Sequence, residues 1–371
     1  MSELRALTGA RGVAAWFVVL FHLRAALGVS DGVERVLAKG YLAVDFFFLL
    51  SGFVIWLSYA DRITVQRWRA IPGFLRRRVA RIWPLHLVML GFALLIVAAL
   101  ALTGRPPDPR FPLDRLPVHI LLLQNWPMTR DWFGITALDW NDPAWSISSE
   151  MFAYLAFPLL PLVIDWRRVP TPGLIAAIAV ALGLLAYVMR SNGMATLGQA
   201  IPWFGVLRCV TEFAAGTAVA ALWLRHREQP RRALVAALCV SSLGFASFAT
   251  GLVNEIVAIP AALAALLLAI ALTSNRPGNP LASWPLHQLG EISFSTYLSH
   301  SLLWTAFKMA FVASAVAVPP LLIGALLIAI LLASLVLYHG VERPAQAWIN
   351  RLDKHQKGAS KHADPRVSRR L

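Results

Sequence analysis

The sequence has very little cysteine and little charge. Only two of its 371 residues are cysteines, and both Cys209 and Cys239 lie in apolar runs, which excludes a disulfide framework and gives no metal-ligand spacing. Charged residues make up 14% of the chain, and no long polar block is present to build a separate soluble domain. These absences argue against a soluble protein, and we expect no bound metal.

Apolar residues dominate what is present, at 58% of the chain, with a mean hydropathy of +0.63. This profile is typical of a polytopic membrane protein. Ten apolar runs are long enough, or nearly so, to span a bilayer: 9–28, 41–60, 82–103, 145–164, 173–190, 201–224, 232–250, 256–273, 292–312 and 318–339. We therefore predict an all-α, polytopic integral membrane helix bundle with a transmembrane domain at 1–345 and a basic, disordered cytoplasmic tail at 346–371.

The distribution of lysine and arginine predicts the orientation. If the N-terminus is cytoplasmic, 24 of the 34 basic residues lie in inside segments, 6 lie in outside segments and four lie within spans. Basic residues gather in cytoplasmic loops, so both termini are predicted to be inside. The same rule explains the net charge of +15 without nucleic acid as a partner. The Arg- and Ala-rich composition points to a bacterium of high GC content, and we expect a multi-pass protein of the inner (plasma) membrane.

Polar residues within the spans are candidates for function. Arg11 and His22 are eleven residues apart in the first run, which is about three helical turns and places both on one face. By depth, His22, Asp45 and Glu150 all fall in the outer half of the membrane. Each alone has an ordinary reading, such as a core histidine or a helix cap. Three costly groups at one depth favour catalysis, with Asp45 or Glu150 orienting His22.

A second cluster is predicted at the cytoplasmic side. Arg78 and Arg81 are three residues apart on one helix face, and Arg11 lies at the same depth. The ordinary reading is a set of topology anchors. The alternative is a site where guanidinium groups bind the phosphates of an anionic ligand.

Five further residues carry weaker signals for substrate contact. Ser51 precedes Gly52 where helices can approach closely, and helix packing explains it equally well. Trp145 begins the fourth run, and Tyr154 lies one turn below Glu150, where its hydroxyl can hold the carboxylate. Tyr297 and His300 share a face near mid-membrane. The outside segment 104–144 is long enough to be a lid or a binding loop.

At these residues the chain resembles the acyltransferase 3 family of membrane-bound acyltransferases. The resemblance rests on Arg11 and His22 and on several short motifs in order. These are the segment 40–53 around Asp45, Arg78-x-x-Arg81 with Ile82 and Pro84, Pro143-Ala144-Trp145-Ser146 with Glu150 and Tyr154, the segment 292–300, and Val341-Glu342-Arg343-Pro344. Thr8 departs from the pattern, because the family's Asp is expected there.

The resemblance implies an O-acyltransferase of sugars and of cell-surface or secreted molecules. The donor would be a cytoplasmic acyl-CoA, with acetyl-CoA expected, bound by Arg11, Arg78 and Arg81. The acceptor would be a hydroxyl of a sugar or polysaccharide at the outer side, with His22 as general base or, as the alternative, as the acyl carrier. Acylation of a small secreted glycosylated metabolite is a narrower alternative. A proton-coupled transporter and a lipid-binding scaffold remain as rivals.

Overall fold

The computed structural model describes residues 4–129, 138–312, 318–349 and 351. All regular elements of these residues are helical, which confirms the predicted all-α fold. The long helices are α1 (Arg5–Leu23), α3 (Ala43–Gln66), α4 (Ile71–Leu102), α9 (Thr171–Ser191), α10 (Ile201–His226), α11 (Arg231–Ala249), α12 (Glu255–Thr273), α14 (Ser293–Phe311) and α15 (Pro320–Leu337).

Shorter elements connect these helices. They are η1 (Arg24–Ala26), α2 (Asp31–Leu37), η2 (Gly40–Leu42), η3 (Arg67–Ala70), η4 (Leu113–Arg115), α5 (Leu116–Ile120), α7 (Ala144–Ala156), α8 (Leu159–Val163), η5 (Pro280–Ala282), α13 (Trp284–Glu291) and the π-helical turn η6 (Tyr338–Glu342). Helix α15 continues through η6, and the continuous helical segment extends to Ile349. The domain boundary placed at residue 345 therefore falls inside a helix, while residues 352–371 lie outside the described residues.

Each of the ten apolar runs contains a helix in the structure. Among the residues that the structure describes, eight segments are long and apolar enough to span a membrane, and one of them, Asp31–Leu102, contains both α3 and α4. The chain is therefore a multi-pass membrane protein. The count of ten spans and the cytoplasmic placement of both termini stay predictions.

In two of the apolar runs the helix bounds differ from the predicted ones, and the sequence explains both differences. Helix α4 begins at Ile71 rather than near 82, because Pro72 suits a first turn and the arginines that follow are good helix formers. The fourth run is split into α7 and α8 near Pro158, which lacks the backbone N–H needed to continue the helix. The early start places Arg78 and Arg81 on the helix itself.

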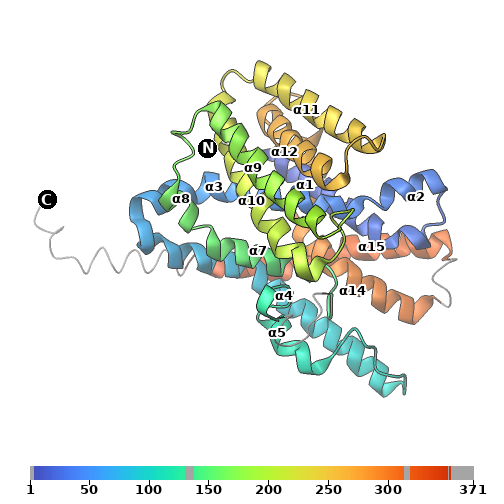
Figure 1. The fold of residues 1–371 in the computed structure, drawn as a ribbon. Coiled ribbons are helices and arrows are strands. Elements are labelled where there is room, and N and C mark those ends of the chain that lie inside the picture. Colours follow the sequence, from blue (N-terminus) through green and yellow to red (C-terminus); the bar gives the residue numbers. More distant parts are fainter. Residues whose placement is uncertain (1–3, 130–137, 313–317, 350, 352–371) are drawn as a thin grey trace, which may run out of the picture.

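Helix α10 lies at the centre of the bundle and packs against α3, α7, α9 and α12 (Figure 1). Helices α11 and α12 lie together at one edge. The contact between α3 and α10 is very close, since a Cβ added to Gly52 would lie 1.9 Å from the carbonyl oxygen of Phe213. This confirms that Gly52, next to Ser51, allows the close helix approach.

Helix α1 packs along α13 and α14. A Cβ on Gly290, in α13, would lie 1.8 Å from the carbonyl oxygen of Thr8. The N-terminal entry is thus fixed by backbone proximity at Thr8, the position where the chain departs from the family pattern. This packing holds Arg11 and His22 against α14.

Candidate functional site

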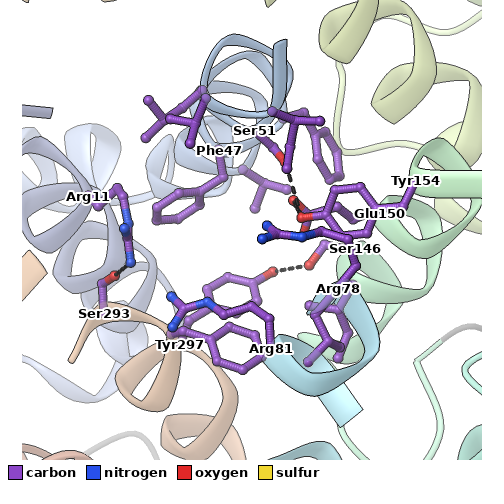
Figure 2. A pocket seen from close by; sticks show the side chains of 18 residues that line it. Arg11, Phe47, Ser51, Arg78, Arg81, Ser146, Glu150, Tyr154, Ser293 and Tyr297 are labelled. Atoms are coloured by element: carbon purple, nitrogen blue, oxygen red, sulfur yellow. Dashed lines mark hydrogen bonds between the residues drawn. The ribbon is translucent and has the colours of Figure 1, made fainter. Parts of the chain in front are cut away.

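A cavity of about 170 Å³ lies among α1, α3, α4, α7 and α14 (Figure 2). Its lining includes polar side chains from all five helices, interleaved with Phe47, Phe48 and Phe294. Seven of the eleven residues predicted for the site line it: Arg11, Ser51, Arg78, Arg81, Glu150, Tyr154 and Tyr297. The remaining four, His22, Asp45, Trp145 and His300, lie outside this lining.

The predicted cytoplasmic arginines meet in this cavity. Arg11 donates a hydrogen bond from Nη2 to Ser293 Oγ at 3.1 Å. The guanidinium of Arg78 donates to the Tyr59 hydroxyl at 3.2 Å and lies over the rings of Tyr59 and Tyr154. Among the described residues its Nε has no hydrogen-bond partner. Arg11 and Arg78 therefore keep donor capacity for a ligand.

Arg81 is placed differently, because it forms an ion pair with the buried carboxylate of Glu342. Ser295 Oγ also donates to this carboxylate at 2.9 Å. Glu342 belongs to the Val341–Pro344 motif, to which the sequence analysis gave no role. Its position shows that the motif supplies the counter-charge of Arg81, so Arg81 carries less free positive charge than its two neighbours.

Glu150 and Tyr154 form a short polar chain on the cavity wall. The Tyr154 hydroxyl donates to Glu150 Oε1 at 2.6 Å, which confirms the predicted contact between them. The same hydroxyl lies 3.2 Å from Ser51 Oγ. Figure 2 shows this chain facing Arg11 across the cavity.

Asp45 has a partner that the sequence analysis missed. Arg208 on α10 donates from Nε and Nη2 to the two carboxylate oxygens, each at 2.7 Å, and both side chains are almost fully buried. Glu212 lies one turn beyond Arg208 and is also buried. Trp145 packs against the same group, with the Arg208 guanidinium 5.4 Å from its ring centre. Asp45 and Trp145 thus belong to a buried polar cluster that joins α3, α7 and α10.

We predicted that Asp45 or Glu150 orients the imidazole of His22, and the structure shows other partners. His22 Nδ1 lies 3.0 Å from the Val18 carbonyl oxygen and 3.2 Å from His300 Nε2. The carboxylate that faces its Nε2, at 3.5 Å, belongs to Asp142. Depth along the helices was a poor guide here, because it ignores the direction in which each side chain points.

Tyr297 lies between the cavity and the two histidines. Its hydroxyl is 2.8 Å from Ser146 Oγ and 3.2 Å from the Pro143 carbonyl oxygen. Its ring centre lies 5.9 Å from that of Phe47 and 6.1 Å from that of His300. Tyr297 and His300 share one face of α14, as predicted, and His300 in turn contacts His22, so the three rings lie in a row from the cavity wall to His22.

The described part of the outside segment 104–144 is bound to the bundle. His86 Nε2 contacts the His119 carbonyl oxygen at 2.7 Å, and Asn125 Nδ2 donates to Ser149 Oγ at 2.6 Å. Burial, and then the nearby His86 and Arg115, lowers the pKa of His119 to about 3, so its imidazole is neutral at physiological pH. The segment thus packs against the middle of α4 and the first turns of α7, and its last residues include Asp142 beside α1.

The chain belongs to the acyltransferase 3 family, because the family model described as an acyltransferase domain matches residues 4–339. Together with its apolar helices, this match makes it a membrane enzyme that transfers acyl groups.

Curated relatives agree with this assignment. Acyltransferase MdmB of Streptomyces mycarofaciens is 32% identical over 321 residues, covering 80% of this chain and 78% of that protein. Exopolysaccharide production protein ExoZ of Rhizobium meliloti (strain 1021) is 25% identical over 316 residues, covering 82% of this chain and 89% of that protein. Protein 2 in picA locus of Rhizobium radiobacter is 36% identical over 155 residues, covering 39% of this chain and 75% of that protein. No solved structure matches the chain.

Proposed function

We propose that this enzyme is an O-acyltransferase that moves an acyl group from a cytoplasmic acyl-CoA to a sugar hydroxyl at the outer side of a bacterial inner membrane. Acetyl-CoA is the expected donor. The observation that carries this proposal is the cavity itself, which is lined by the guanidinium groups of Arg11, Arg78 and Arg81 and by Tyr297, whose ring lies next to the His300–His22 pair.

The arginines support the choice of donor. Coenzyme A carries several phosphate groups, and guanidinium groups bind phosphate through charged, paired hydrogen bonds. Arg11 and Arg78 have donor capacity left after their contacts with Ser293 and Tyr59. The aromatic side chains Phe47 and Phe48 give the cavity an apolar part that suits the arm carrying the thioester.

His22 is proposed as the general base. As the acceptor oxygen forms its bond to the thioester carbonyl carbon, the hydroxyl proton moves to the imidazole. The carbon–sulfur bond then breaks, and the coenzyme A thiolate leaves and is protonated by the imidazolium. Histidine suits both transfers because it titrates near neutral pH.

The name of the exopolysaccharide-related protein supports a carbohydrate acceptor for this chain. In that case the acceptor approaches His22 from the side of Asp142. The Asp142 side chain is 43% exposed and that of His22 is 22% exposed, so this side of the imidazole is the more open one. A small secreted glycosylated metabolite satisfies the same chemistry.

The test uses the purified protein in detergent with radiolabelled acetyl-CoA. We expect release of free coenzyme A thiol and transfer of label to a sugar hydroxyl, with an oligosaccharide, a simple methyl glycoside and a glycosylated macrolide as separate acceptors. A transporter releases no thiol under these conditions. Folded protein that binds acetyl-CoA but releases no thiol with any acceptor would contradict the proposal.

A further inference from the structure

The imidazole of His22 is held in one tautomer by its neighbours. Nδ1 lies 3.0 Å from the Val18 carbonyl oxygen, and a carbonyl oxygen only accepts hydrogen bonds. Nδ1 therefore carries the hydrogen in the neutral ring. The lone pair is left on Nε2, which is the nitrogen that faces Asp142.

His300 supports the same tautomer from the other side. Its Nδ1 lies 3.2 Å from the Thr296 carbonyl oxygen, which places the hydrogen of His300 on Nδ1 and a lone pair on its Nε2. That Nε2 is 3.2 Å from His22 Nδ1, so it is a second acceptor for the same hydrogen. Since His300 is only 1% exposed, this arrangement is fixed by packing.

The contact between His22 and Asp142 then has an unusual consequence. In the neutral ring, the Nε2 lone pair and the Asp142 carboxylate are two acceptors facing each other at 3.5 Å, with no hydrogen between them. The contact becomes favourable once Nε2 carries a proton, because the two groups then form an ion pair, which a small approach turns into a charged hydrogen bond. The pair is therefore built for the state in which His22 has taken a proton.

We propose that Asp142 is the positioning residue of His22, which accepts a hydrogen bond from Nε2 of the imidazolium formed during acyl transfer. This inference rests on the proposed function, in which His22 is the general base. Asp142 stays ionised throughout: the proton moves from the acceptor hydroxyl to Nε2 and from Nε2 to the leaving thiolate. The carboxylate stabilises the charge between the two transfers.

Other polar groups near this pair are already engaged. Arg110, whose charge acts on Asp142, is bound by Asp108 at 2.6 Å. Arg24 donates to the Phe21 carbonyl oxygen at 2.6 Å.

On η2, the Tyr41 hydroxyl donates to Glu255 at 2.5 Å. On α14, His300 lies on the Nδ1 side of His22. Among the described residues, Asp142 is thus the carboxylate placed to act on Nε2.

The inference can be tested on the imidazole itself, without an acceptor. Diethyl pyrocarbonate modifies the unprotonated imidazole, so the rate of modification of His22 against pH, measured by mass spectrometry, reports its protonation. The purified full-length protein is compared with Asp142→Asn and Asp142→Glu between about pH 5 and 8. Asp139→Asn is the matched control, because that carboxylate lies in the same segment but pairs with Arg115 at 2.9 Å.

We expect the midpoint of the Asp142→Asn profile to lie about one pH unit below that of the wild type, since the nearby negative charge is lost. Below the midpoint this means roughly tenfold faster modification. Asp142→Glu should restore most of the shift, and Asp139→Asn should leave the profile unchanged. The inference is overturned by an unchanged midpoint in Asp142→Asn, by an equal shift in Asp139→Asn, or by a His22 that is unmodified at every pH.

Failure of the proposed function would look different. If His22→Gln retains acyl transfer, His22 is not the base, whatever the modification profiles show. If His22→Gln is inactive while Asp142→Asn keeps the wild-type midpoint, only the role of Asp142 is wrong.

Discussion

Replacing Arg208 by glutamine should lower the stability of the bundle more than the replacement of an exposed arginine. Arg208 and Asp45 are 2% and 0% exposed, respectively, and form two hydrogen bonds at 2.7 Å. Breaking a buried pair from one side leaves an uncompensated buried charge, which costs about 3–5 kcal/mol. Asp45→Asn should cost less, because the buried carboxyl group of Glu212 lies one turn from Arg208 and is free to ionise and balance its charge once Asp45 is neutral.

Thermal unfolding in detergent measures this order of stability. Arg168→Gln is the matched control, because Arg168 pairs with Asp165 at the surface, is 87% exposed and should contribute no more than about 1 kcal/mol. If Arg208→Gln and Asp45→Asn both unfold like Arg168→Gln, the buried pair does not stabilise the bundle. If the Asp45→Asn protein is fully stable but inactive, Asp45 has a catalytic role rather than a structural one.

Three further predictions concern packing, donor binding and topology. Gly52→Ala should destabilise the protein by about 1–3 kcal/mol in thermal unfolding, because the added Cβ meets the α10 backbone. Gly91→Ala is the control, since a Cβ there has no neighbouring atom within 4 Å, and equal stability of the two variants would contradict the close approach of α3 and α10. Arg78→Ala should weaken acetyl-CoA binding by about 1.5–3 kcal/mol in calorimetry, less at high salt, and unchanged affinity would make it a topology anchor only. In a cysteine-free background, an impermeant thiol reagent should label a cysteine at Asp31 in intact cells but not one at Arg168, and the reverse pattern would invert the orientation.

Pairs of cavity residues on one helix were predictable from the helix period, but the depth argument wrongly placed Glu150 and the arginines in separate clusters, although they line one cavity. Arg78 and Arg81 share a helix face three residues apart, and Tyr154 lies one turn from Glu150, so each pair follows from helix geometry alone. The apolar runs likewise predict the helices, because a bilayer requires long segments with satisfied backbones.

The partners between helices were less predictable. Arg208 and Glu212 are one turn apart in an apolar run, and this spacing was a signal of a buried polar cluster on one face of α10. The pairing of Arg208 with Asp45 depends on how α3 is rotated against α10, and spacing within one helix does not give that rotation. Asp142 was missed because it precedes the fourth span and was treated as part of a loop.

The most direct test of the account is acyl transfer by His22→Gln. Glutamine keeps the approximate size and the hydrogen-bonding capacity of histidine but does not titrate near neutral pH. It can therefore replace a histidine that only packs, but not one that acts as a general base. We expect His22→Gln to reach the membrane at normal levels, to bind acetyl-CoA and to transfer acyl groups about 10²–10⁴ times more slowly than wild type. His339→Gln, at an exposed histidine of η6, should transfer at the wild-type rate. Near wild-type transfer by His22→Gln would contradict the central claim that this imidazole takes the acceptor proton.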